Sequence, residues 1–232
     1  MKVLTVNVGR PKSVEYTESP SGMTGIDKQP VDGAVRVTDP GPKGKGGGGL
    51  DGDAVCHLRH HGGTDQAVYA FAREDLDHWE RELGRPVANG SFGENLTTSG
   101  LDVSGAKIGE RWRIGQELVL EVTSGRVPCR TFGSWLGERG WVKRFTLHAV
   151  PGAYLRVVVP GEIRGGDAIE VVHRPDHEVT VALSFRAGTT ERALLPQVLA
   201  AGDALHPELL EKARAYVAKF GASGKSVQGK SA

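Results

Sequence analysis

The residues most able to do chemistry lie in one short turn at residues 124–130, which follows a strand pattern over residues 118–123. A glycine and a proline interrupt that pattern, because glycine permits unusual dihedrals and proline has no N–H to donate. The turn places the Cys129 thiol between Arg126 and Arg130. Nearby cations, and a helix starting directly afterwards, favour the thiolate form of a cysteine. The turn therefore predicts a nucleophile or metal ligand, and a small buried hydrophobic thiol is the alternative.

Polar residues elsewhere could share a site with this thiol. Alternation over residues 54–61 predicts a strand with Arg59 and His61 on a polar face and Cys56 on a core face, where its thiol would be inert. A loop with two glycines carries Glu94 and Asn95. Arginine binds phosphate through two parallel hydrogen bonds. Carboxylate and amide groups bind the hydrogen-bond donors and acceptors along the edge of a heterocycle. Together with Arg126 and Cys129, these residues suit an anionic ligand that carries an amide-rich heterocycle.

Two motif matches lack the context that they need. Residues 224–231 match G-x-x-x-x-G-K-S, but a phosphate-binding loop needs a strand before it and a helix after it, and here the order is wrong. The pairs His57/His60 and His173/His177 have zinc-like spacing, but no cysteine or carboxylate set completes four ligands. We also expect His57 and His60 to point to opposite faces of their strand.

Composition narrows the class of protein. The 232 residues include 29 basic and 28 acidic side chains, a balance that argues against a general polyanion binder. Two cysteines do not make a disulfide framework, and the N-terminus reads as a strand rather than a signal region. No run approaches the roughly 18–20 apolar residues of a membrane span. We therefore expect a cytoplasmic protein without membrane association.

Hydrophobic periodicity predicts a mainly β, α+β chain followed by three helices. The glycine-rich run at residues 39–49 is predicted to be a mobile surface loop, with phosphate binding as the alternative. A polar flexible tail is expected over 222–232. The predicted strands cover 2–8, 25–31, 34–38, 54–61, 111–114, 118–123, 154–159 and 168–172. The predicted helices cover 73–83, two short segments between 131 and 148, then 180–186, 191–200 and 207–220.

Three signatures in fixed order resemble the MOSC domain, the family named for the C-terminal domain of molybdenum cofactor sulfurase. They are residues 61–67 (HGGTDQA), 92–96 (FGENL) and 126–129 (RVPC). The MOSC pattern also fits the turns at 50–53, 160–161 and 166–167 and the strand at 154–157. The resemblance covers most of 1–173, and residues 177–221 resemble the three-helix appendage of stand-alone bacterial MOSC proteins. The glycine-rich insertion at 41–49 departs from the pattern, at the rim of the expected pocket.

This resemblance implies a MOSC-type β-barrel domain at 1–173, a small three-helix domain at 177–221 and a bound molybdenum cofactor (molybdopterin). It places Cys129 as molybdenum ligand and catalytic residue. The implied activity is reduction of N-hydroxylated compounds such as hydroxylaminopurine-type base analogues, with electrons from a separate reductase. The cofactor-binding residues that it implies are Lys28, Arg59, His61, Glu94, Asn95 and Arg126.

Three alternatives concern function and assembly. A low-pKa thiol could instead carry sulfur as a persulfide on Cys129. The C-terminal helices could belong to a nucleic-acid-binding module, but their mixed charge is typical of a solvated face. A homodimer is compatible with the sequence, which does not decide the oligomeric state.

Overall fold

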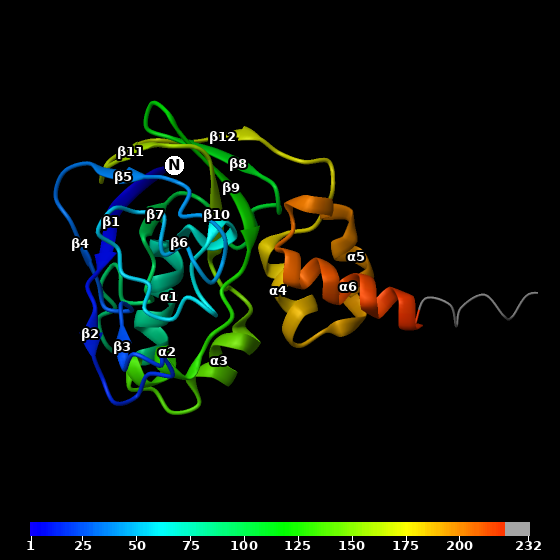
Figure 1. The fold of residues 1–232 in the computed structure, drawn as a ribbon, viewed down its shortest axis with the longest axis horizontal. Coiled ribbons are helices and arrows are strands. Elements are labelled where there is room, and N and C mark those ends of the chain that lie inside the picture. Colours follow the sequence, from blue (N-terminus) through cyan, green and yellow to red (C-terminus); the bar gives the residue numbers. More distant parts are fainter. Residues whose placement is uncertain (221–232) are drawn as a thin grey trace, which may run out of the picture.

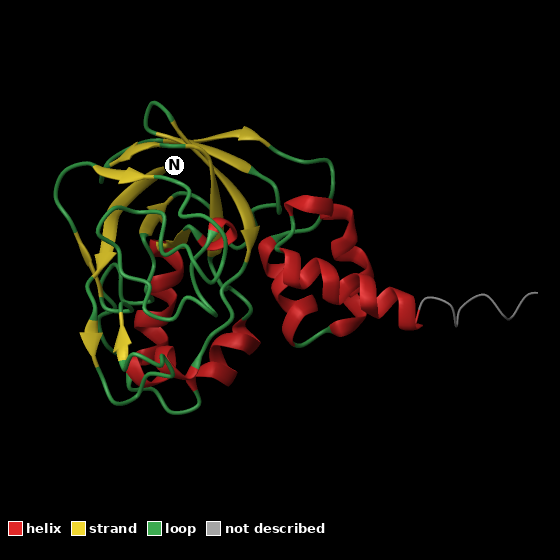
Figure 2. Ribbon diagram, viewed as in Figure 1, coloured by secondary structure: helices red, strands yellow, loops and turns green. Residues whose placement is uncertain are grey.

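A computed structural model describes residues 1–220, in which a large mixed sheet is followed by a cluster of helices (Figures 1 and 2). The strands are β1 (Lys2–Gly9), β2 (Lys12–Ser13), β3 (Met23–Thr24), β4 (Lys28–Pro30), β5 (Val35–Val37), β6 (Val68–Ala72), β7 (Leu96–Ser99), β8 (Arg111–Ile114), β9 (Leu118–Ser124), β10 (Ala153–Val159), β11 (Gly161–Ile163) and β12 (Ile169–His173). The α-helices are α1 (Arg73–Leu83), α2 (Arg130–Leu136), α3 (Trp141–His148), α4 (Val181–Thr189), α5 (Leu195–Val198) and α6 (Pro207–Phe220). The 3-10 turns are η1 (Thr64–Gln66), η2 (Arg192–Leu194) and η3 (Leu199–Ala204).

Within residues 1–220, the main sheet has eight strands in the order β12-β8-β9-β10-β6-β7-β1-β4, and its only parallel pair is β6 with β7. The mainly β, α+β class is confirmed. The sheet does not close into a barrel with continuous strand pairing. Strand β1 pairs with β7 and β4 along its length, and it contacts the β12 end of the sheet only at its first residues. There, an isolated bridge joins Lys2 to Ala168, and the Ile169 N–H donates to the Met1 carbonyl at 3.0 Å.

Two hydrophobic clusters hold these elements. The larger one includes Trp112 and Val122 of the sheet together with Val181 and Ala213 of the C-terminal helices, all fully buried. The smaller one is aromatic, with Trp79 of α1 packed against rings of α3 and of the loop before β7. Because the larger cluster continues from the sheet into α4 and α6, the sheet and helices share one core.

Helices α4 and α6 begin within one residue of the predicted positions, whereas the helix predicted over 191–200 is divided into η2, the short α5 and η3. The Thr180 hydroxyl accepts a hydrogen bond from the Leu183 N–H at 3.1 Å and so caps α4. Two backbone hydrogen bonds connect the C-terminal helices to the part of the chain that carries the sheet. The Val181 N–H donates to the Ala106 carbonyl at 2.9 Å, and the His206 N–H donates to the Thr123 carbonyl at 3.2 Å. The helices lie beside the β9 and β10 side of the sheet (Figure 1). The domain boundaries at 173 and 177 stay a prediction, and the expected tail and its P-loop-like run lie outside the described residues.

Two local predictions are wrong. Residues 54–61 form turns instead of a strand, and the His61 N–H donates to the His57 carbonyl at 3.0 Å as in a helical turn. The glycine-rich run is also packed rather than free. The Gly63 N–H donates to Gly47 at 3.0 Å, and a Cβ on Gly63 would lie 2.6 Å from Lys43 Cα. Glycine is required at position 63, where φ is 81°, because the two segments touch through their backbones.

Among residues 1–220, no helix has both the length and the apolar content to cross a membrane.

Candidate functional site

A cavity opens between the loops that follow β1, β5 and β9, and most of the predicted site residues line it. The lining includes the predicted residues Lys28, His61, Asn95, Arg126 and Cys129. Its free volume is about 110 Å³. Other lining residues are Thr17, Ser19, Met23, Thr24, Gly25, Ile26, Gly48, Asp53, Ala54, Val55, Cys56, His57, Gly62, Gln66, Ala67, Tyr69, Gly93, Thr131 and Tyr154.

The turn after β9 brings the thiol to this cavity. Gly125 lies so close to the loop before β10 that a Cβ on it would lie 2.6 Å from Pro151 Cγ. Cys129 has extended dihedrals (φ −118°, ψ 170°) and directly precedes α2, so the predicted helix start is confirmed. Its side chain is partly buried against the aromatic cluster. The thiol is therefore held at the cavity wall with one side accessible to a ligand.

Arg126 is a buried cation without an anionic partner. The residue is 7% exposed, and its guanidinium lies 5.1 Å from the Tyr69 ring centre and 4.9 Å from that of Phe132. Its Nε has no hydrogen-bond partner, and no carboxylate in the described part of the chain pairs with it. Burial opposes its charge, but nearby Tyr154 and Tyr69 contribute to a raised pKa for Arg126. A buried charge that lacks a partner is unfavourable and is suited to an anionic ligand.

Lys28, Asp53 and Asn95 form a buried network on another wall. The Lys28 ammonium pairs with Asp53 Oδ1, which also accepts the Gly9 N–H at 2.8 Å. Asn95 Nδ2 donates to Asp53 Oδ2 at 2.9 Å. Burial lowers the pKa of Lys28, and Asp53 partly offsets the effect. Lys28 thus lines the cavity as predicted, with its charge already matched inside the protein.

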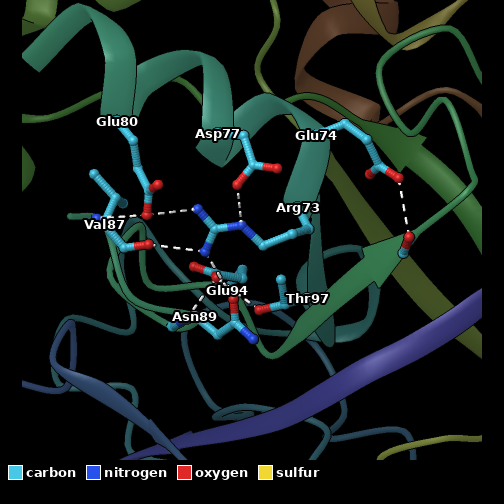
Figure 3. A network of polar contacts seen from close by, with 10 residues as sticks. Arg73, Glu74, Asp77, Glu80, Val87, Asn89, Glu94 and Thr97 are labelled. Atoms are coloured by element: carbon cyan, nitrogen blue, oxygen red, sulfur yellow. Dashed lines mark hydrogen bonds and ion pairs between the residues drawn. The ribbon is translucent and has the colours of Figure 1, made fainter.

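Glu94 does not line the cavity, although it was predicted to shape it. Its carboxylate accepts hydrogen bonds from the Phe92 N–H at 3.0 Å and the Thr97 hydroxyl at 2.9 Å (Figure 3), and it also accepts from the Gly90 N–H. Burial raises the pKa of Glu94. Its role in the fold is to hold the loop that carries Asn95.

The same loop is fixed from outside by helix α1. Figure 3 shows the Arg73 guanidinium of α1 donating to the Val87 carbonyl at 2.8 Å and to Asn89 Oδ1 at 2.9 Å. The Arg73 Nε donates to Asp77 Oδ1 at 2.6 Å, and its Nη2 donates to Glu80 Oε1 at 2.9 Å. The loop before β7 is therefore tied to a packed helix on one side and to Glu94 on the other.

Three predictions about the 54–61 segment change. Arg59 is exposed and does not line the cavity, because the segment turns instead of extending. Cys56 lines the cavity instead of facing the core, and burial raises its thiol pKa. The rings of His57 and His60 meet edge to face at 4.6 Å, so they do not point to opposite faces.

Burial, with a smaller contribution from Arg126, lowers the pKa of His61 to about 3, so its imidazole is neutral at pH 7.

The sequence reasoning missed many of the lining residues, among them Asp53, Gln66, Tyr69 and Tyr154. Asp53 was assigned to a turn, Gln66 to a family signature, Tyr154 to a strand, and Tyr69 to the segment that leads into the helix at 73–83. The Tyr69 hydroxyl donates to the Pro151 carbonyl at 2.8 Å, and Gln66 has a buried Oε1 without a partner. The available signal was the polar end of each tyrosine within an otherwise apolar strand, since buried tyrosine hydroxyls usually require a partner.

Comparison with known proteins identifies the family. The model of the MOSC domain matches residues 57–170. The uncharacterized protein YflK of Bacillus subtilis (strain 168) is 32% identical over 184 residues, which cover 79% of each chain. The chain belongs to the MOSC domain family. The crystal structure of YiiM from Geobacillus stearothermophilus superposes with a TM-score of 0.72 at 26% identity, covering 92% of this chain and 97% of that one.

A further relative of this MOSC protein has a name that refers to chemistry. A protein of Gibberella moniliformis (strain M3125 / FGSC 7600), named "Reductase", is 31% identical over 119 residues. The match covers 50% of this chain and 21% of that protein.

The donor groups of the cavity can be compared with what a molybdenum cofactor would need. A partly accessible thiol is a suitable soft ligand for a metal. The unpaired Arg126 offers a site for an anionic group, and the orphaned Gln66 Oε1 offers an acceptor to a pterin N–H. The volume of about 110 Å³ is below the roughly 300–1,000 Å³ of drug-sized ligand sites, so the cavity would enclose only part of a ligand of that size. The residues fit the group.

Proposed function

We propose that this protein is a molybdenum-cofactor-dependent oxidoreductase that reduces N-hydroxylated compounds and takes electrons from a separate reductase. The observation that carries the proposal is the meeting of two groups at one cavity. Cys129 supplies a thiol, and Arg126 supplies a buried cation with no carboxylate partner among residues 1–220. Membership of the MOSC family and the relative named as a reductase support the same reading.

Each lining residue then has a distinct part. Cys129 would hold the metal, and Arg126 would hold the anionic portion of the cofactor. His61 stays neutral near pH 7 and so contributes hydrogen bonds rather than charge. Asp53 keeps Lys28 and Asn95 in place. When bound, the molybdenum cofactor supplies two-electron chemistry on an N–O bond. The overall change consumes two electrons and two protons and converts R–NHOH into R–NH₂ and water.

Activity with an artificial electron donor tests this proposal without requiring the natural reductase. Protein from a host that makes molybdenum cofactor is supplied with reduced viologen and a hydroxylaminopurine-type substrate, and formation of the amine is measured. We expect turnover by the wild type and none above background in Cys129→Ser. Arg139→Met, which alters an exposed arginine outside the cavity, serves as a control and should retain wild-type activity.

Sulfur transfer through a Cys129 persulfide is the competing function. It predicts that mass spectrometry after incubation with a sulfur donor finds an added sulfur atom on Cys129. Full reductase activity in Cys129→Ser, or active protein without molybdenum, would contradict the reductase proposal. A persulfide on Cys129 that is delivered to an acceptor, without any N–O reduction, would favour sulfur transfer.

A further inference from the structure

The C-terminal helices supply none of the residues that line the cavity, but they are joined to a segment that supplies two of them. Residues 61–66 include His61 and Gln66, which both line the cavity. The last turn of this segment, η1, packs against β9 and β10. Its Thr64 N–H donates to the Gly41 carbonyl of the glycine-rich run at 2.8 Å. The contacts that hold η1 therefore also determine where His61 and Gln66 lie.

Arg156 of β10 joins η1 to the C-terminal helices. Its Nη2 lies 2.9 Å from Asp65 Oδ1 of η1 and donates to the Ala204 carbonyl of η3 at 3.1 Å. Its Nη1 lies 3.5 Å from Glu121 Oε1 of β9. One guanidinium thus holds η1, η3 and β9 together.

Two other contacts link the same parts of the chain. The Thr123 hydroxyl of β9 donates to the Asp65 carbonyl at 2.7 Å, and the Thr123 carbonyl accepts the His206 N–H at 3.2 Å. An ion pair of Lys43 with Glu208 links the glycine-rich run to α6. Because Glu208 is 70% exposed, that pair contributes little to stability.

The Asp65 carboxylate depends on Arg156 more than the Glu121 carboxylate does. Among residues 1–220, Asp65 forms an ion pair only with Arg156, whereas Glu121 also pairs with Arg111 at 2.7 Å. The Asp65 and Arg156 side chains are 24% and 22% exposed, so water screens their attraction less than that of a surface pair. Removing Arg156 therefore releases Asp65 and η1 but leaves Glu121 paired.

We propose that Arg156 is a positioning residue, which holds η1 against the C-terminal helices and so fixes His61 and Gln66 at the cavity. The helices then support the site without contributing a residue to it, because the Ala204 carbonyl orients the guanidinium that binds Asp65. This placement exists in the cofactor-free protein. Its consequence for cofactor retention rests on the proposed function.

Native-state hydrogen exchange of the cofactor-free, full-length protein, followed by NMR, tests this role. In Arg156→Met we expect the Thr64 and Gln66 N–H groups, which donate to the Gly41 and Gly63 carbonyls, to exchange at least about tenfold faster. A hydrogen bond to a charged group accounts for a factor of that size. The amides of β7, which lies between β6 and β1 in the sheet, should change less than about twofold. A general loss of stability would accelerate both sets together.

Three further variants locate the effect. If Arg156 acts through Asp65, adding Asp65→Asn to Arg156→Met should change the exchange of η1 less than about twofold. Arg156→Lys keeps a cation near Asp65 without the planar fork, so it should recover part of the protection. Arg113→Met removes an exposed ion pair with Glu170 elsewhere on the sheet, and it should leave the exchange of η1 as in the wild type.

The inference would be overturned by wild-type exchange of η1 in Arg156→Met, by equal acceleration of η1 and β7, or by fully additive effects of Arg156→Met and Asp65→Asn. Molybdenum content is measured in parallel on protein from a cofactor-competent host. We expect Arg156→Met to lose molybdenum several-fold, and unchanged content with a loosened η1 would refute the support of the site. Wild-type protein without molybdenum would instead contradict the proposed function, and the exchange rates would still decide whether Arg156 positions η1.

Discussion

Replacing Arg126 with methionine should change stability and cofactor binding in opposite directions. The guanidinium is almost fully buried, and no carboxylate among residues 1–220 pairs with it. Its stabilising contacts are with the rings of Tyr69 and Phe132 at about 5 Å. Methionine fills a similar volume and carries no charge, so Arg126→Met removes both the desolvation penalty and these cation–π contacts.

The two effects on stability can be weighed. Replacing buried charges by well-packed apolar groups is neutral to about 4 kcal/mol stabilising. A cation–π contact contributes about 0.5–2 kcal/mol. Because no carboxylate among residues 1–220 forms an ion pair with Arg126, we expect the desolvation penalty to outweigh the ring contacts, with a net stabilisation of about 2 kcal/mol for the cofactor-free protein. In a chain of this size, that raises Tm by roughly 4–8 °C.

The effect on cofactor binding has the opposite sign. A hydrogen bond to a charged group contributes about 1.5–3 kcal/mol, so the affinity for an anionic ligand should fall about 10- to 150-fold. Thermal unfolding of cofactor-free protein measures the first effect, and molybdenum content of protein from a cofactor-competent host measures the second. Arg139→Met should leave both within experimental scatter, because surface substitutions typically change stability by less than about 0.5 kcal/mol.

A lower Tm together with unchanged molybdenum content in Arg126→Met would refute this reasoning. That result would show that Arg126 is a structural cation whose ring contacts outweigh its desolvation.

Three other predictions test local features of the structure. Burial and the neighbouring Asp102 raise the pKa of Asp75 to about 6, so the folded state holds that proton more tightly than the unfolded chain does and stability should fall as pH rises from about 4 to 6. Urea titrations should show Asp75→Asn more stable than wild type at pH 7, on the order of 2 kcal/mol, with the difference shrinking at pH 4. Because the pKa of His61 is lowered to about 3, its ring resonances should not titrate between pH 5 and 8 in an NMR experiment, and a midpoint near 6.5 would contradict its burial. Gly63→Ala should destabilise the protein by about 1–3 kcal/mol and expose residues 41–49 to proteolysis, because φ is 81° and the new Cβ would clash with Lys43. Unchanged proteolysis would show that the loop is not packed there.

Elements with strong periodic patterns were predictable from the sequence. Helix α6 begins at Pro207, as its helical apolar spacing predicts, and α1 ends at a left-handed Gly84. The strand over residues 54–61 failed because alternation gives a strand only where a partner strand is available. Here the segment folds back on itself, with the His60 N–H donating to the His57 carbonyl at 3.1 Å.

The site was predictable where local sequence carries the chemistry. Cys129 and Arg126 both line the cavity, and the sequence pointed to them because a thiol and a guanidinium share one turn. Asp53 and Tyr154 were missed because they reach the cavity from loops and strands far apart in sequence, and periodicity shows which face a residue occupies but not which strands are neighbours. Glu94 lies outside the cavity lining because its carboxylate binds two backbone N–H groups of its own loop and the Thr97 hydroxyl, and backbone partners leave no sign in the pattern of side chains.

The molybdenum-to-protein ratio tests the central claim most directly. Wild type and Cys129→Ser are purified in parallel from a host that makes molybdenum cofactor, and metal content is measured by mass spectrometry. The proposed function predicts close to one molybdenum per wild-type chain and a large loss in Cys129→Ser, with Arg139→Met unchanged. Wild-type protein that lacks molybdenum, or a Cys129→Ser variant that retains all of it, would contradict the assignment of Cys129 as the metal ligand.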